Sequence, residues 1–225
     1  MNKIIQSLIK EVVQIEISGK KLVNGTLVDL GSDMIVLFNG TDFVYIPLNH
    51  IQSFVVDRNN ENDIQDPSEF SLIIADENKD DLSFKEVLTQ ATGKNVEIYV
   101  TDGQLLHGHI TCIMNDYIVF FSPIYKTMYI SMKHLKWLIP YPQNECLYDM
   151  NVPNVPVQSN NHSLAISFEE QVQKYKNTLV VLNIGGNKSY IGKIKNIEKQ
   201  VVEIQRARSA PFYLNLDHIK TLHQV

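Results

Sequence analysis

The chain has 225 residues, of which 44% are hydrophobic and 20% charged, a composition that can bury a core and that excludes a disordered or collagen-like chain. Its formal net charge of −5 argues against a general nucleic-acid binder, and its two cysteines are too few to staple a secreted mini-domain. No apolar run approaches the ~20 residues that span a bilayer, and the first residues lack the apolar core of a signal peptide. We therefore expect a soluble protein made inside the cell, with no membrane partner.

The dominant feature of the sequence is a threefold repeat with a period of 83–84 residues. Three residue types recur at this spacing: a glycine, a tyrosine between apolar neighbours, and a histidine followed by Ile or Leu. The glycines are Gly25, Gly108 and Gly192, the tyrosines are Tyr45, Tyr129 and Tyr213, and the histidines are His50, His134 and His218. So many coincident positions at one period indicate three copies of one structural unit.

Each copy predicts one short helix followed by five strands. In the first copy the helix covers residues 4–9, and a strand of alternating apolar residues follows at 13–17. A second strand passes through the repeated glycine, a third covers residues 34–38, and Asn39-Gly40 then predicts a hairpin. The fourth strand carries the repeated tyrosine, and the fifth follows the repeated histidine.

The helices of the second and third copies begin with the signature of a capping box, Ser83 with Glu86 and Ser167 with Glu170. One helix and five short strands in about 58 residues predict a small, strongly bent barrel. The expected fold is therefore mainly β, with three tandem five-stranded barrels that are each preceded by a short N-terminal helix.

Two connectors of different composition separate the three copies. The predicted parts are repeat 1 at 1–57, an acidic linker at 58–82, repeat 2 at 83–141, a Pro/Asn-rich linker at 142–166, and repeat 3 at 167–225. Residues 57–82 carry a local charge of −7, whereas repeat 3 carries +4. The acidity of the whole chain therefore lies mainly in one linker.

The repeated unit resembles the Sm-like fold, in which a helix precedes a bent five-stranded barrel. Gly25-Thr26-Leu27, leading to residues 34–37, is similar to the first sequence motif of that superfamily. The whole arrangement is similar to the N-terminal region of the Bacillus spore coat protein B family, which also contains three such units. The matching segments here are Leu182-Asn183-Ile184-Gly185-Gly186, His50-Ile51-Gln52-Ser53 and His218-Ile219-Lys220-Thr221. Only the third unit keeps the Gly-Gly turn, and no role of that family's Ser/Lys/Arg-rich tail is expected here.

The resemblance implies a non-enzymatic structural protein of the bacterial endospore coat, synthesised in the mother-cell cytoplasm and bound to other coat proteins or to itself. The strand edges that carry Tyr45, Tyr129 and Tyr213 are the expected protein-interaction sites, and packing or a contact between barrels is the alternative for the tyrosines themselves. Three barrels either form half of a six-barrel ring that a second copy completes, or pack against one another within a monomer.

The alternative function is that of an Sm-like RNA- or ligand-binding regulator. RNA-binding members of that superfamily place an Asp and an Asn in one loop, and the aligned positions here are Gly31 and Ile35. An apolar residue cannot replace an amide that bonds a base edge, so we expect no nucleic-acid partner. Repeat 3 has a basic cluster beside Tyr190, for which a solvated strand face is favoured over a weak nucleic-acid surface: Lys188, Lys193, Lys195, Lys199, Arg206 and Arg208.

His107 and His109 form a metal-like motif, because residues two apart on a strand share a face. No cysteine or carboxylate cluster accompanies the pair, so a metal site, or a metal-dependent enzyme, is the weaker interpretation and we expect no cofactor. The repeated histidines lack a recurring nucleophile or acid, which argues against catalysis. We expect no catalytic residue; the repeated glycines and histidines are expected to be structural, the histidines bonding backbone groups. Cys112 and Cys146 are interpreted as reduced thiols, with intermolecular disulfides as the alternative in a coat.

Overall fold

The computed structural model describes residues 3–65, 74, 82–100, 105–142, 145–149, 164–184 and 189–225. Within these ranges the chain forms fifteen strands and three short α-helices, so the prediction of a mainly β protein is confirmed. The helices are α1 (Lys3–Gln6), α2 (Phe84–Ala91) and α3 (Phe168–Lys174). Among the described helices, none is long and apolar enough to cross a membrane.

The chain divides into two compact units by its internal contacts. The first unit comprises Met1–Ile98 and Lys136–Gln143, and the second comprises Tyr99–Leu135 and Asn144–Val225. The boundary therefore passes through the second repeat, and each unit is described by itself below. The repeat boundaries deduced from the sequence stay a prediction.

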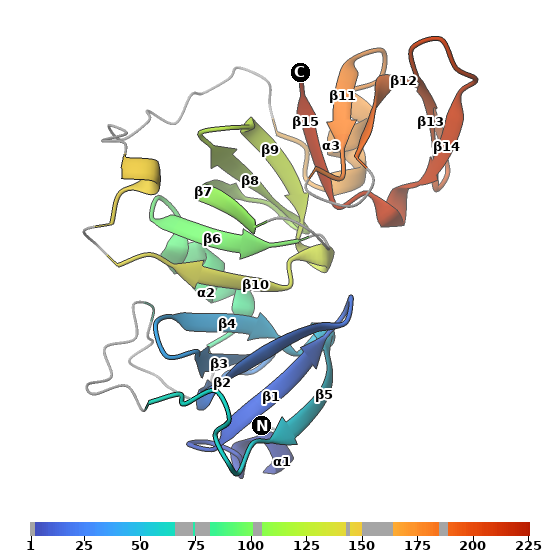
Figure 1. Cartoon of the computed structure of the whole chain (residues 1–225). Helices are drawn as coiled ribbons and strands as arrows, with labels where there is room; N and C mark the ends of the chain where they lie inside the picture. The colour runs from blue at the N-terminus through green and yellow to red at the C-terminus, as the bar shows by residue number, and fades with distance from the viewer. Residues whose placement is uncertain are drawn as a thin grey trace. The chain divides into compact units, whose positions relative to one another are not determined.

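In its described residues the first unit has seven strands, in the order β6-β10-β4-β3-β2-β1-β5 (Figure 1). They are β1 (Val12–Ile17), β2 (Lys21–Leu30), β3 (Met34–Phe38), β4 (Phe43–Pro47), β5 (Ile51–Val56), β6 (Asn95–Tyr99) and β10 (Trp137–Pro140). The 3-10 turn η1 (Leu48–His50) joins β4 to β5. The five strands of repeat 1 are neighbours in this sheet, and β10 of repeat 2 adds to them beside β4.

The described part of the second unit has eight strands, in the order β14-β13-β12-β11-β15-β9-β8-β7. They are β7 (Leu105–Ile113), β8 (Tyr117–Ser122), β9 (Lys126–Ser131), β11 (Leu179–Leu182), β12 (Tyr190–Glu198), β13 (Val201–Gln205), β14 (Phe212–Asn215) and β15 (Thr221–Gln224). Its 3-10 turns are η2 (Met132–His134), η3 (Leu147–Asp149) and η4 (Leu216–His218). The core of repeat 3 combines its own strands with α3 and with Tyr117 and Tyr129 from repeat 2.

The second strand of each repeat bends at the same place. The pairing register shifts between Leu27 and Asp29 in β2, between Ile110 and Cys112 in β7, and between Ile194 and Asn196 in β12. A bulge inserts one extra residue and increases the local twist, so the strand curves over the core. The threefold period of the sequence is thus also a period of the backbone.

The strands of a repeat do not close on themselves among the described residues. In repeat 1 the fifth strand pairs with the first, whereas the fourth strand pairs with the last strand of repeat 2. In repeat 2 the fourth strand likewise pairs with the last strand of repeat 3. Each set of five strands is therefore a segment of an open sheet, where the sequence alone predicted a barrel for each repeat.

The helix ends follow the sequence where local capping decides them. Ser83 and Ser167 both form the predicted capping boxes with Glu86 and Glu170. The first helix is shorter than the predicted range 4–9: Leu8 and Ile9 donate to the carbonyls three residues before them, as in a turn, and the N–H of Lys10 donates to Leu27 O of β2 at 2.7 Å. The chain thus leaves the helix through a turn before it pairs with the sheet.

Both predicted linkers contribute buried residues where the structure describes them. Ile64, Ile74 and Leu82 of the acidic linker are buried, as are Leu147 and Ala165 of the second. Residues 66–73, 75–81, 143–144 and 150–163 of these linkers lie outside the described residues, as do the predicted turns at Asp102-Gly103 and Gly185-Gly186.

Candidate interaction site at the repeat junctions

The two junctions between repeats have the same strand register. Strand β10 sets Leu138 opposite Tyr45 of β4, and β15 sets Leu222 opposite Tyr129 of β9. Leu138 and Leu222 occupy the same position in their repeats. Each of these junctions therefore joins the edge of a fourth strand to the fifth strand of the next repeat, and the repeated tyrosine marks the centre of that contact.

At each junction an aspartate side chain also binds the helix of the next repeat through a hydrogen bond. Asp33 Oδ1 accepts a hydrogen bond from the N–H of Phe84 at 2.7 Å, and Asp116 Oδ1 accepts one from the N–H of Phe168 at 2.8 Å. The first N–H groups of a helix lack partners within the helix, so each aspartate satisfies one of them. The sequence reasoning missed these two residues, although their spacing equals the repeat period.

The tyrosines at the two junctions are buried. Tyr45 is fully buried, and its hydroxyl donates to Ile74 O at 2.9 Å, while burial raises the pKa of Tyr45 to about 12. Tyr129 accepts a hydrogen bond at 2.9 Å from the hydroxyl of Tyr175, which follows α3. Burial also raises the pKa of Tyr175. Neither Tyr45 nor Tyr129 is available to another molecule in this fold.

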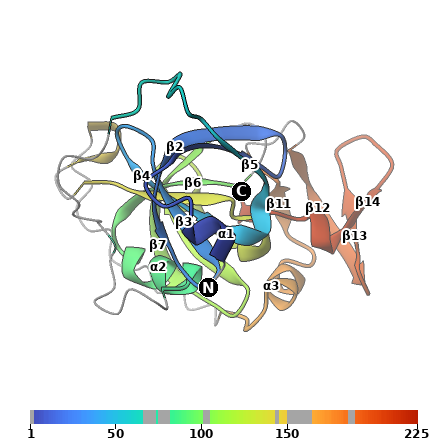
Figure 2. The same ribbon diagram turned by 90° about the horizontal axis from the view of Figure 1, so that it is seen from below.

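Tyr213 differs from its two counterparts because 66% of its surface is exposed. It lies on β14, which pairs with β13 and is the end strand of its sheet among the described residues of the second unit. Figure 1 and Figure 2 both show β13 and β14 on the side of β12 away from β11. The position of Asp33 and Asp116 is taken in repeat 3 by the exposed Gln200. Of the three predicted interaction tyrosines, only Tyr213 therefore lies on an exposed edge.

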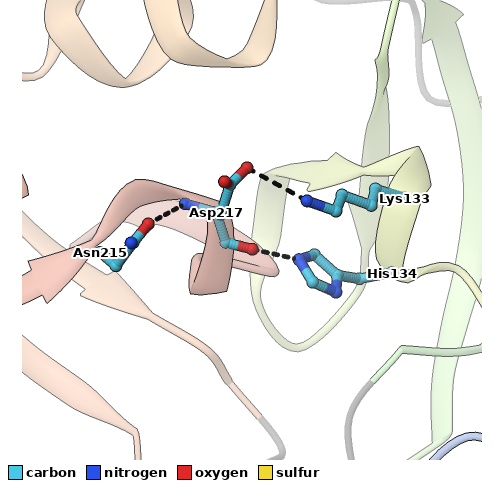
Figure 3. A network of polar contacts seen from close by, with 4 residues as sticks. All are labelled: Lys133, His134, Asn215 and Asp217. Carbon is cyan, nitrogen blue, oxygen red and sulfur yellow. Dashed lines mark hydrogen bonds and ion pairs between the residues drawn. The ribbon is translucent and has the colours of Figure 1, made fainter. Parts of the chain in front are cut away.

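A polar network joins η2 of repeat 2 to η4 of repeat 3 (Figure 3). Lys133 Nζ lies 3.1 Å from Asp217 Oδ1, and His134 Nε2 donates to the backbone carbonyl of Asp217 at 2.8 Å. Asn215 Oδ1 accepts a 2.9 Å hydrogen bond from the Asp217 N–H. Burial lowers the pKa of His134, which favours the neutral ring. Because Lys133 and Asp217 are both exposed, the ion pair contributes ~1 kcal/mol or less.

Lys133 and Asp217 also line a cavity of about 300 Å³ in the second unit. Asp116 and Glu169 add two carboxylates to its lining, and Phe168 and Ile219 add apolar surface. The cavity therefore has a lining of mixed charge, with one lysine and three carboxylates. We interpret it as a consequence of the junction.

The three repeated histidines share a place in the backbone and differ in their contacts. Each ends the 3-10 turn between the fourth and fifth strands of its repeat. His50 is buried, with Nδ1 3.0 Å from Ser18 Oγ, whereas His134 bonds a backbone carbonyl. His218 is exposed, and its backbone carbonyl accepts from Asn183 Nδ2 at 3.0 Å. The predicted backbone bond of the ring is thus present at His134.

The repeated glycines lie where two strands approach closely. A Cβ atom at Gly25 would lie 2.7 Å from Phe38 O, and one at Gly192 would lie 2.6 Å from Gln205 O. At Gly108 a Cβ would collide with the carbonyl of Phe121. At each repeated glycine the third strand therefore lies so close to the second strand that a side chain would collide with the backbone of the third strand.

His107 and His109 both lie on β7 and are half-buried. The His107 ring contacts Tyr148 edge-on at 6.0 Å, and the His109 ring lies 5.2 Å from Phe121. Burial lowers the pKa of His109. The described residues contain no group of three His, Cys, Asp or Glu that could hold a metal ion.

Cys112 and Cys146 form no disulfide in the described part of the chain; Cys146 is exposed and Cys112 is half-buried. In the basic cluster, Arg206 lies 4.9 Å from the Phe212 ring, which in turn stacks on Tyr190 at 5.0 Å. Lys193, Lys195 and Lys199 are exposed, and Lys188 lies outside the described residues. The Arg206 guanidinium of this cluster thus lies beside Phe212 of β14.

Comparison with known proteins places the chain in a family. It is 35% identical over 217 residues to protein YwrJ of Bacillus subtilis (strain 168), itself uncharacterized, and the match covers 94% of both chains. The chain belongs to the YwrJ family. The family model for the YwrJ third domain matches residues 167–222, which run from the N-cap of α3 into β15.

Proposed function

We propose that this YwrJ-family protein is a non-enzymatic structural protein of the bacterial endospore coat, which assembles through contacts between its tandem Sm-like units and other proteins. The observation that carries the proposal is the edge of β14, which no described strand covers and which bears the exposed Tyr213. An unpaired strand edge presents N–H and C=O groups to any strand that can add to it. The location in the coat, and synthesis in the mother cell, rest on the resemblance to the spore coat protein B family.

Support for Sm-like units comes from the order of elements in repeat 1. A short helix precedes five strands that are ordered β5-β1-β2-β3-β4, and β2 carries a bulge that bends it. The same helix and bulge recur in repeat 3 with α3 and β12. A bent strand of this kind allows five short strands to curve around one core.

Support for an assembly role comes from how the junctions are built. Two of the three fourth-strand edges already bind a strand of the next repeat. The outer edge of the fourth strand therefore binds another strand in repeats 1 and 2. The fourth strand of repeat 3, β14, has an edge of the same kind and carries the exposed Tyr213. Tyrosine is enriched at the centres of protein interfaces because it buries a large area with little loss of side-chain freedom.

A fluorescent fusion followed through sporulation tests this function. We expect the fusion to form a shell around the forespore and the Tyr213→Glu variant to stay diffuse in the mother cell. Ile191→Glu is the matched control, since Ile191 is 58% exposed on β12 and lies away from the edge. Diffuse signal in vegetative cells, with saturable oligonucleotide binding at low salt, would instead support the RNA-binding regulator.

A further inference from the structure

We propose that the strand added to β14 is β5 of a second copy of this chain, so that copies join head to tail. The inference rests on the proposed function and names its partner. The two junctions within the chain serve as the template for this third one.

The template fixes the register of the contact. Leu138 and Leu222 face the tyrosines at the two internal junctions, and the residue at their position in repeat 1 is Phe54. The third junction therefore sets Tyr213 opposite Phe54 of the second copy. Both side chains are aromatic, a cross-strand combination that stabilises antiparallel sheets.

Strand β5 is open in the way this contact requires. Its counterparts β10 and β15 each pair on both sides, whereas β5 pairs with β1 and is the end strand of its sheet in the described part of the first unit. Val55 on β5 is 58% exposed, while its counterpart Ile139 on β10 is only 8% exposed. The apolar side chain at this position is therefore buried on β10 and left in solvent on β5.

Charge favours this pairing of ends. Repeat 3 carries +4, and residues 57–82, which directly follow β5, carry −7. Arg206 lies against Phe212 and so brings a positive charge to the β14 edge. Complementary charge steers the association and disfavours contact between two basic edges.

The contact between copies is weaker than the junctions inside the chain. Gln200 stands where Asp33 and Asp116 cap the helix of the following repeat, so that hydrogen bond has no equivalent. Covalent linkage also raises the effective concentration of the internal strands, an advantage that a second copy lacks. We therefore expect reversible, concentration-dependent association. A head-to-tail contact produces rings where the rotation closes and filaments where it does not.

Cysteine cross-linking tests the register directly. In a Cys112→Ser, Cys146→Ser background, Tyr213→Cys and Phe54→Cys are made as separate proteins. Facing residues of antiparallel strands have Cα atoms about 4.5–5.5 Å apart, within reach of a disulfide. We expect disulfide dimers in the mixture and none in either protein alone. Dimers of the Tyr213→Cys protein alone, or no dimers in the mixture, would overturn the proposal.

Sedimentation gives a second measurement that does not need a substituted Phe54. Val55→Lys changes an exposed side chain, so it should fold and should weaken association by at least about tenfold, whereas Ile191→Lys should leave association unchanged. If Val55→Lys associates like the wild type, the head-to-tail contact is wrong. The proposed function then survives only if Tyr213→Glu still abolishes the forespore shell, and the two failures are thereby distinguished.

Discussion

The contrast between Tyr45 and Tyr213 gives the sharpest test of this fold. Tyr45→Phe removes a hydroxyl that donates to Ile74 O at 2.9 Å and accepts from Ile74 N at 3.3 Å in a fully buried site. Leaving those backbone groups without a partner costs about 1–3 kcal/mol of unfolding free energy. We therefore expect the variant to lose that much stability at pH 7, measured by urea unfolding.

The same substitution has a predictable pH dependence. Burial raises the pKa of Tyr45 from near 10 to about 12, so its neutral form stabilises the fold below pH 10, and that stability is lost as pH rises from 10 to 12. At pH 11 the unfolded tyrosine is mostly ionised and the folded one is not, a difference of about 1.4 kcal/mol. The variant lacks this loss, so the gap between the two proteins should shrink by about 1.4 kcal/mol at pH 11.

The matched control is Tyr213→Phe, because Tyr213 is exposed and its change should stay within about 0.5 kcal/mol at both pH values. Equal effects of the two substitutions, or a gap for Tyr45→Phe that does not change with pH, would contradict the burial of β4. They would also remove the reason for regarding β14 as the one exposed edge among the three tyrosine strands.

Three further predictions concern the junctions and the repeated positions. Asp116→Ala should lower the unfolding free energy by about 0.5–2 kcal/mol through loss of the α3 cap, whereas Gln200→Ala should have little effect in the same urea titration. Gly108→Ala should cost about 1–3 kcal/mol, because the new methyl group collides with the carbonyl of Phe121; a neutral result would mean that β7 and β8 do not approach closely. Burial lowers the pKa of His134, so its contribution to stability is complete above pH 6.5 and falls as pH drops below that value; His134→Gln should flatten this part of the pH profile.

The elements that local chemistry decides were predictable from the sequence. The strand at residues 34–38 has the predicted bounds because its apolar run ends at the Asn39-Gly40 turn. Both capping boxes form because Ser83 and Ser167 stand three residues before a glutamate. The period of the sequence is also seen in the backbone, because the bulges in β2, β7 and β12 recur at the same spacing.

The exposure of the three repeated tyrosines was not predictable in the same way. Their flanking residues are alike, and all three lie in a strand, so each had the same local reason to meet a partner. Their exposure depends on the strand that pairs with each outer edge: β10 and β15 cover the first two edges, whereas no described strand covers the edge of β14. A local pattern holds no information about a strand that pairs from more than eighty residues away.

The sequence by itself determined a mainly β chain built from three copies of one unit, because repeat period, apolar alternation and caps are local signals that add up along the chain. Only the tertiary structure decided that the copies share strands instead of closing separately, that the compact units number two, and that Tyr213 alone of its set is exposed. The physical reason is that an open strand edge gains hydrogen bonds and buried surface from any matching strand. Among the described residues, strands of the following repeat therefore cover the edges of β4 and β9, which carry Tyr45 and Tyr129. The edge of β14, which carries Tyr213, stays open.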